Sequence, residues 1–247
     1  MKDRATFRIW RTQPGGGGGF RDYTTAVSDG MVVLDAVHRI QAEQAPDLAV
    51  RWNCKAGKCG SCSAEVNGRP RLMCMTRLSQ VNLDEPVTVE PMRTFPPIKD
   101  LVTDVSWNFK VKTGIRKITP RKPDAPDGTF RMAQRDVDRV QEFRKCIECF
   151  LCQDVCHVLR DHAKFDEFVG PRFMIYTAQL EMSPIDTADR IPDLKQQHGI
   201  GYCNITKCCT KVCPEHIHIT DNGIIPLKER VVSRFYDPMT RLLHMLR

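Results

Sequence analysis

The chain has 247 residues, of which 41% are hydrophobic, so it can form one large or two ordinary packed domains and lies outside the range of disordered proteins. Its formal net charge is +7, but the basic residues are spread along the chain and form no long Lys/Arg block, which disfavours a nucleic-acid-binding arm. No apolar stretch approaches the roughly 18 residues that a membrane helix needs. We therefore expect a globular protein that does not itself cross a membrane.

The first hundred residues are expected to be rich in β-structure. Apolar and polar residues alternate from Ala5 to Trp10, as is typical of a strand. The run from Gly15 to Gly19 lacks the Lys-Ser/Thr of a phosphate-binding loop, so it predicts a hairpin turn before a return strand over Arg21 to Val27. Apolar residues near helical spacing predict a helix over Met31 to Gln44, which Pro46 closes.

A second hairpin is expected around Asn67-Gly68, because both residues tolerate positive φ. The flanking strands are Ser63 to Val66 and Arg71 to Met73, and Val87 to Glu90 is expected to close the sheet. The prolines that follow mark a linker, namely Pro91, Pro96 and Pro97.

The second half of the chain predicts helices. Apolar residues at helical spacing lead up to Ile147, and further helices are expected over Arg172 to Glu181 and Ile224 to Phe235. Pro184 and Pro192 are expected to break the chain between them. Proline and charged residues from 116 to 127 predict an exposed loop.

Twelve cysteines are the most informative feature of the sequence. The segment from Met1 to Trp10 has no apolar core of a secretory signal, so we expect the chain to stay in the reducing compartment where it is made. In such a compartment dense cysteines usually bind metal or perform redox chemistry rather than form disulfides.

The first cysteine group has the C-x4-C-x2-C…C spacing of a plant-type [2Fe–2S] ferredoxin. Its members are Cys54, Cys59, Cys62 and Cys74. Gly57 and Gly60 are expected to allow close backbone approach and to offer N–H groups to the cluster sulfurs. Lys55 and Lys58 either offset the negative charge of the cluster or are ordinary solvated loop residues.

The second group opens with C-x2-C-x2-C-x3-C, the signature of bacterial two-cluster ferredoxins, in which the fourth cysteine serves the other cluster. Its members are Cys146, Cys149, Cys152 and Cys156, followed by a distant set of Cys203, Cys208, Cys209 and Cys213. Zinc is the main alternative for any cysteine cluster, but structural zinc usually takes paired C-x2–4-C knuckles. Steps of three residues favour a cuboidal iron–sulfur cluster instead.

Several motifs in order resemble the iron–sulfur subunit of succinate dehydrogenase and fumarate reductase over nearly the whole chain. They are CKAGKCGSC (54–62), FPPIKDLVTD (95–104), CIECFLCQDVC (146–156), Gly170-Pro171 and CNITKCCTKVCP (203–214). The resemblance implies an α+β protein, with a plant-type ferredoxin-like β-grasp domain over residues 1–105. An all-α bacterial ferredoxin-like domain then follows over residues 106–247.

The resemblance also assigns the ligands. The [2Fe–2S] cluster would be held by Cys54, Cys59, Cys62 and Cys74. The [4Fe–4S] cluster would be held by Cys146, Cys149, Cys152 and Cys213. The [3Fe–4S] cluster would be held by Cys156, Cys203 and Cys209. Some relatives carry a fourth cysteine where this chain has Thr206, so three ligands are expected here. Cys208 is interpreted as a buried free thiol, with an exchangeable fourth ligand as the alternative.

The implied function is electron transfer within a respiratory membrane complex that also serves the tricarboxylic acid cycle. A flavoprotein subunit with FAD would oxidise succinate, and electrons would pass through the three clusters to a quinone at membrane-anchor subunits. The complex would lie on the cytoplasmic face of the bacterial plasma membrane, and nucleic acid is not an expected partner. The chain would carry no catalytic residue of its own.

The quinone end departs from the family pattern. Many relatives have a proline at the position of His157, a tryptophan within the segment that is Val158 to Phe168 here, and a histidine at Asn204. His157 lies either near a quinone or at a partner contact, or is an ordinary boundary histidine.

Three other functions stay open at this stage. The same subunit could serve fumarate reduction, which runs in the opposite direction. A heterodisulfide reductase-like complex uses similar iron–sulfur modules. A basic zinc module that binds nucleic acid is the alternative from a different class of protein.

Overall fold

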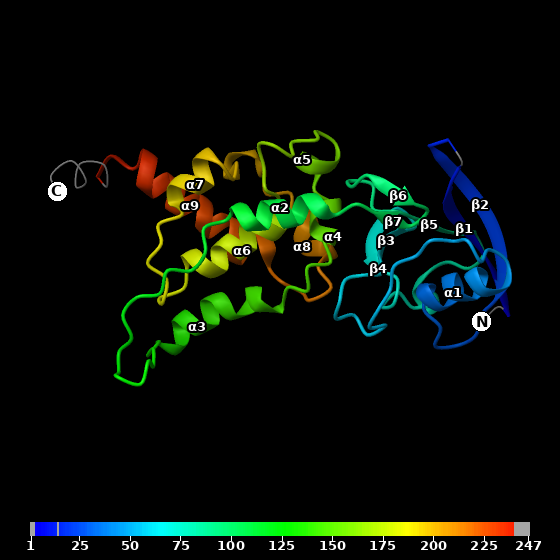
Figure 1. Cartoon of the computed structure of the whole chain (residues 1–247), viewed down its shortest axis with the longest axis horizontal. Helices are drawn as coiled ribbons and strands as arrows, with labels where there is room; N and C mark the ends of the chain where they lie inside the picture. Colours follow the sequence, from blue (N-terminus) through cyan, green and yellow to red (C-terminus); the bar gives the residue numbers. More distant parts are fainter. Residues whose placement is uncertain (1–2, 14, 240–247) are drawn as a thin grey trace. The chain divides into compact units, whose positions relative to one another are not determined.

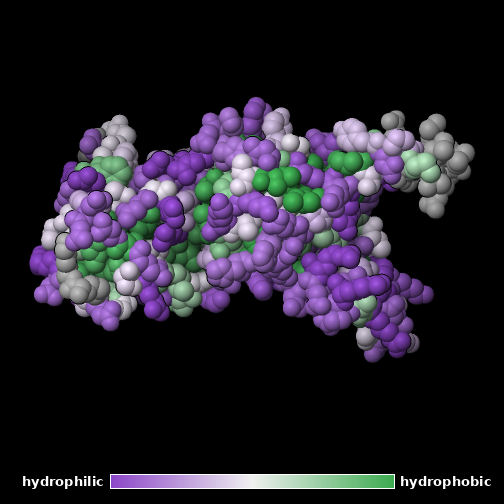
Figure 2. All heavy atoms as spheres, turned by 180° about the vertical axis from the view of Figure 1, so that it is seen from behind, coloured by the Kyte–Doolittle hydropathy of each residue, from purple (hydrophilic) through white to green (hydrophobic). Residues whose placement is uncertain are grey.

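The computed structural model in Figure 1 describes residues 3–13 and 15–239. Contacts divide the chain into two compact units, Met1–Ser106 with Ile147–Val155, and Trp107–Cys146 with Cys156–Arg247. The second half therefore contributes one short segment to the first unit. Among the described residues no helix is long and apolar enough to cross a membrane. Hydrophilic side chains cover most of the face seen in Figure 2, with hydrophobic groups between them.

The first unit is built on a five-stranded mixed sheet with the strand order β2-β1-β5-β3-β4. Its strands are β1 (Arg4–Thr12), β2 (Gly18–Ala26), β3 (Ser63–Val66), β4 (Arg69–Leu72) and β5 (Val87–Glu90). Strands β1 and β5 run parallel, and every other neighbouring pair is antiparallel. Phe7 and Ile9 on β1 are fully buried, as are Val87 and Val89 on β5. The strands confirm the prediction of a β-rich first half.

Helix α1 (Val33–Glu43) confirms the predicted helix and covers part of this sheet (Figure 1). Its apolar stripe, which includes Leu34, Val37 and Ile40, is buried. The carboxylate of Asp35 accepts a hydrogen bond from the N–H of Val32 at 3.1 Å, which satisfies one of the free donors at the start of the helix.

The proline-rich segment after β5 is more ordered than a linker, so that interpretation was wrong. Pro97–Lys99 (β6) and Val102–Thr103 (β7) pair as a two-stranded antiparallel sheet. Asp100 between them is fully buried and accepts hydrogen bonds from Arg11 Nε at 3.1 Å, Thr12 N at 2.8 Å and Ala49 N at 2.8 Å. A buried carboxylate with this many donors is well compensated, so the turn is held firmly against β1.

The described part of the second unit contains helices and no strand, apart from a single bridge between Pro120 and Asp186. Its regular helices are α2 (Ser106–Gly114), α3 (Gln134–Gln141), α5 (His157–Arg160), α6 (Pro171–Glu181), α7 (Ile191–Gln196), α8 (Cys208–Val212) and α9 (Ile225–Tyr236). Two short 3-10 helices, η2 (Glu142–Lys145) and η3 (Ile200–Tyr202), and one π-helical turn, η4 (Ile219–Ile224), join them.

Helix α6 is the centre of the second unit. Phe173, Met174 and Ile175 on it are buried, and the helix packs against η4. A Cβ at Gly223 on η4 would lie 3.0 Å from the Ile175 side chain, so a small residue is needed there. Pro192 was expected to break the chain, but it lies in the first turn of α7, where proline is tolerated because its missing N–H has no helical partner.

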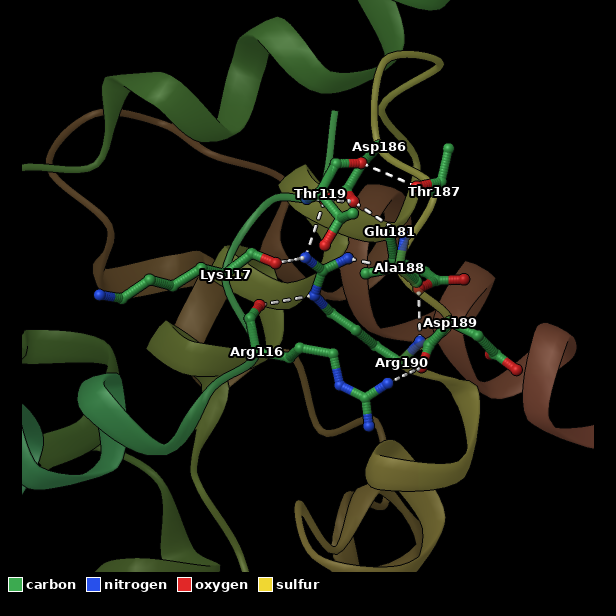
Figure 3. Close-up of polar contacts among 9 residues, drawn as sticks. All are labelled: Arg116, Lys117, Thr119, Glu181, Asp186, Thr187, Ala188, Asp189 and Arg190. Carbon is green, nitrogen blue, oxygen red and sulfur yellow. Dashed lines mark hydrogen bonds and ion pairs between the residues drawn. The ribbon is translucent and has the colours of Figure 1, made fainter. Parts of the chain in front are cut away.

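A fully buried arginine fixes the exposed loop that precedes α3 (Figure 3). Arg190 donates from Nε to the carbonyl of Arg116 at 2.8 Å and from Nη2 to the carbonyl of Lys117 at 2.7 Å. The same guanidinium forms an ion pair with Asp186 at 2.8 Å, and the Arg190 N–H donates to the Glu181 carboxylate at 3.1 Å. Burial raises the pKa of Glu181.

Candidate iron–sulfur cluster sites

The first cysteine group lies in a loop of the first unit that depends on left-handed backbone. Lys55, Gly57 and Gly60 have φ values of 54°, 68° and 68°. Cys54 is exposed and Cys59 is half-buried, whereas Cys62 and Cys74 are buried. The loop therefore runs from the surface into the unit, as expected for a loop that wraps one side of a cluster.

Backbone N–H groups point at the sulfurs of this loop. Ala56 N and Lys58 N lie 3.4 and 3.3 Å from Cys54 Sγ, and Cys74 N lies 3.5 Å from Cys62 Sγ. Such N–H···S contacts stabilise thiolate ligands. Close approaches do occur at Gly57 and Gly60: an added Cβ would lie 2.9 Å from Met75 Sδ at the former and 2.6 Å from Cys149 Cα at the latter.

The pKa values of two thiols in the loop, Cys59 and Cys62, are shifted in opposite directions. Burial raises the pKa of Cys62 to about 12. Partial burial also raises the pKa of Cys59, but hydrogen bonds with Cys54 and Ser61 outweigh it and lower the pKa to about 6. A thiolate at Cys62 is costly without a positive partner, and iron supplies one, so cluster binding and deprotonation are coupled. Lys55 lies over the Trp52 ring at 4.7 Å rather than free in solvent.

The second predicted set is divided between the two units. Cys149 and Cys152 are buried in the first unit, and the segment that carries them is tied down by Thr94, whose hydroxyl donates to the Asp154 carbonyl at 2.8 Å. Cys146 and Cys213 belong to the second unit. Burial raises the pKa of Cys213 and the charge of Cys146 raises it further, so these two sulfurs are neighbours.

The third predicted set surrounds one cavity within the second unit. The cavity has a volume of about 20 Å³ and is lined by Cys156, Cys203 and Cys209. Its other lining residues are His157, Val158, Phe168, Pro171, Asn204, Thr206, Lys207, Cys208, Thr220 and Ile224. Burial raises the pKa of Cys156 to about 11, and the Thr220 hydroxyl lies 3.5 Å from Cys209 Sγ. The structure thus brings together residues that are more than forty positions apart in the sequence.

Cys208 also lines this cavity and is half-buried, so its description as a buried thiol was wrong. Its Sγ lies 3.3 Å from the Thr206 hydroxyl. A hydrogen bond with Cys209 lowers the pKa of Cys208 to about 5, with further hydrogen bonds from Thr206 and His157, while burial opposes the shift.

Two serines beside the first cysteine group were not singled out from the sequence. Ser61 hydrogen-bonds the Cys59 thiol. Ser63, which is 7% exposed, lies 2.8 Å from the carbonyl of Gly60 and 2.9 Å from the carbonyl of Cys149. The CGSCS sequence places Ser61 close to Cys59, so it gave a hint of that contact. Nothing in the sequence indicated the contact of Ser63 with Cys149, which is 86 residues away.

The residues fit iron–sulfur clusters by the chemistry of their donors. Each predicted set offers only thiols, the ligands such clusters prefer, and the first loop adds N–H groups directed at sulfur. Among the described side chains, no three His, Cys, Asp or Glu residues converge closely enough to hold a single metal ion. The fold and the donor sets define a ferredoxin-type iron–sulfur protein.

Family models match both halves of the chain. Residues 6–110 match a 2Fe-2S iron-sulfur cluster binding domain, and residues 142–217 match a 4Fe-4S dicluster domain. These matches establish [2Fe–2S] and [4Fe–4S] cluster domains in one chain.

Known relatives identify the family. A fumarate reductase iron-sulfur subunit of Mycobacterium tuberculosis is 32% identical, and the match covers 88% of this chain and 89% of that protein. A chain of the Mycobacterium smegmatis Sdh1 complex in the apo form is 61% identical with a TM-score of 0.92, over 96% of this chain and 99% of that one. One subunit of the fumarate reductase (CoM/CoB) of Methanothermobacter marburgensis is 30% identical, but the match spans only 40% of its length. The chain belongs to the iron–sulfur subunits of succinate dehydrogenase and fumarate reductase, and it is an electron-transfer subunit of a multi-subunit oxidoreductase.

Proposed function

We propose that the chain is the iron–sulfur subunit of a succinate dehydrogenase that delivers electrons to quinone. When bound, the clusters supply one-electron redox chemistry between a two-electron flavin and the quinone. Succinate oxidation is favoured over fumarate reduction by the 61% identity to a chain of the Sdh1 complex, which extends over nearly the full length of both chains. The partners are a flavoprotein subunit with FAD and membrane-anchor subunits, which would hold the chain against the cytoplasmic face of the plasma membrane.

Fumarate reduction is the second candidate, because the M. tuberculosis relative carries that name. Steady-state turnover of the purified complex distinguishes the two. Succinate oxidation with a quinone acceptor should exceed fumarate reduction with a quinol donor. Turnover confined to fumarate reduction would reject the dehydrogenase assignment. A heterodisulfide reductase-like complex is distinguished by its partners, because the proposed complex should copurify with a subunit that carries covalent flavin.

The proposed ligands divide the cysteines four, four and three. Cys54, Cys59, Cys62 and Cys74 would hold [2Fe–2S]. Cys146, Cys149, Cys152 and Cys213 would hold [4Fe–4S]. Cys156, Cys203 and Cys209 would hold [3Fe–4S]. The cavity shared by the last three supports that set, and the N–H groups directed at Cys54 and Cys62 support the first.

A pair of matched variants tests this division. Replacing Cys156 by serine should abolish the EPR signal of the oxidised [3Fe–4S] cluster and leave the reduced [2Fe–2S] signal in place, because Cys156 lines the cavity that Cys203 and Cys209 share. Replacing Cys54 by serine should have the opposite effect. Loss of the [2Fe–2S] signal alone in the Cys156 variant would refute the assignment.

The proposed quinone contact on this chain lies beside the cavity that Cys156, Cys203 and Cys209 line. His157 and Asn204 both line that cavity. His157 would then contact quinone or an anchor subunit, and replacing it by Gln should raise the KM for quinone more than it changes kcat. An unchanged KM would leave His157 without a role in quinone binding.

A further inference from the structure

Ser63 and Gly60 join the first cysteine group to the second within one compact unit. Both residues and Cys149 belong to that unit, although Cys149 lies far along the sequence. We propose that these two residues are the electronic contact between the [2Fe–2S] and [4Fe–4S] clusters. The inference rests on the proposed cluster assignment, in which Cys62 and Cys149 are ligands of different clusters.

The hydrogen bond supplies the first half of the contact. Ser63 follows Cys62 directly, and its hydroxyl donates to the Cys149 carbonyl at 2.9 Å. A route of covalent bonds therefore leaves Cys62 Sγ through the backbone to the Ser63 hydroxyl, crosses one hydrogen bond, and reaches Cys149 Sγ through its own Cα and Cβ. The hydroxyl has one hydrogen, which is shared with the Gly60 carbonyl at 2.8 Å, so both loops are held by the same group.

The close approach of Gly60 supplies the second half. An added Cβ at Gly60 would lie 2.6 Å from Cys149 Cα and 2.9 Å from Cys149 Cβ, so any side chain would separate the two segments. The φ of Gly60 is also +68°, which favours glycine. Gly60 lies between Cys59 and Cys62, so the two cysteine groups are in van der Waals contact at this point. Electronic coupling falls steeply across empty space and is stronger through bonds and direct contacts.

The step itself moves one electron. With both clusters bound, the residues would carry one electron from [2Fe–2S], which would be oxidised, to [4Fe–4S], which would be reduced, and no covalent bond would form or break. No proton needs to leave the Ser63 hydroxyl. The serine is thus a positioning residue that couples two ligands and does not itself react.

The test compares Ser63→Ala with Thr94→Val in the purified complex with its clusters intact. Thr94 is a matched control because its hydroxyl donates to the Asp154 carbonyl at 2.8 Å and so anchors the same segment by the same kind of bond, away from Cys149. Reduction by viologen radicals from pulse radiolysis should show internal electron transfer between the clusters slowed severalfold in Ser63→Ala and unchanged in Thr94→Val. Midpoint potentials, measured by EPR titration, should stay the same in both.

Equal rates in Ser63→Ala and wild type, or equal slowing in both variants, would overturn the proposal. If Ser63→Ala fails to assemble, Ser63→Thr keeps the hydroxyl and should retain the wild-type rate, whereas slow transfer there would also count against the proposal. Iron and EPR analysis of the wild-type complex checks the cluster assignment separately. Missing clusters would refute the proposed function, while intact clusters with unchanged rates would refute only this inference.

Discussion

Two cysteine segments of this chain have nearly the same backbone and different side chains. In the first, residues 146–156, Glu148 and Phe150 have φ values of 55° and 60° and the short helix α4 (Leu151–Asp154) follows. In the second, residues 203–213, Ile205 and Lys207 have φ values of 63° and 61° and α8 follows. Each segment ends at an extended cysteine, Cys156 or Cys213. The pattern is one ferredoxin turn used twice.

Equivalent positions in the two segments can therefore be compared directly. Cys146 and Cys152 correspond to Cys203 and Cys209, so the outer cysteines of the turn are kept. Cys149 corresponds to Thr206, so the second segment has no cysteine at this position. Under the proposed ligand assignment, the backbone would build the site in both segments, and this one side chain would decide between three and four irons.

The largest expected effect comes from exchanging that side chain. Replacing Thr206 by Cys should add a fourth ligand and convert the third cluster to [4Fe–4S], because the residue already lines the cavity. The oxidised [3Fe–4S] EPR signal should disappear and the iron content should rise by one atom per chain. The reciprocal Cys149→Thr should create a second [3Fe–4S] signal.

Thr206→Ser is the matched control for that exchange, because it keeps a hydroxyl and adds no thiol. It should leave the oxidised signal unchanged. Persistence of the [3Fe–4S] signal in Thr206→Cys, with the cluster otherwise intact, would show that the two segments are not equivalent at this position.

The comparison also shows what the sequence could predict. Alternating residues, apolar spacing and turn signals were sufficient for the strands and α1, because these depend on local pattern. The contact of Ser63 with Cys149 and the pinning of the loop at Arg116 by Arg190 could not be predicted, because they join residues 86 and 74 positions apart. The small sheet around Asp100 was missed for the same reason: its stability comes from Arg11 and Ala49, far away in sequence.

A smaller effect is expected at the residue before each short helix. Phe150 is 6% exposed and stacks edge-to-face on Phe95 with ring centroids 6.4 Å apart, whereas Lys207 makes an ion pair with Asp221 at 2.7 Å and is half-exposed. Glycine relieves left-handed strain of about 1 kcal/mol at either position. Phe150→Gly should still destabilise the protein by about 2–4 kcal/mol, because it loses a buried aromatic ring.

Lys207→Gly should instead change stability by no more than about 1 kcal/mol, since a half-exposed ion pair contributes little. Apparent melting temperatures of the complex, recorded by circular dichroism, measure both variants. Lys207→Asn is the control, because asparagine also tolerates positive φ. Equal losses at the two positions would mean that packing of the Phe150 ring adds no stability beyond what the Lys207 side chain contributes.

The smallest effect is expected at Cys208, which corresponds to Leu151 in the first segment. Leu151 is 1% exposed and belongs to the core, so this position of the turn faces packing rather than a cluster corner. Its neighbour Cys209 occupies the ligand position that Cys152 has in the first segment, and the Cys208 thiol is engaged with Thr206 at 3.3 Å. Cys208→Ala should therefore leave iron content and all three EPR signals unchanged, with a stability loss below about 1 kcal/mol for a small half-buried side chain. If the oxidised [3Fe–4S] signal were lost while Cys209→Ala kept it, Cys208 would be the ligand and the alignment of the two segments would be displaced by one residue.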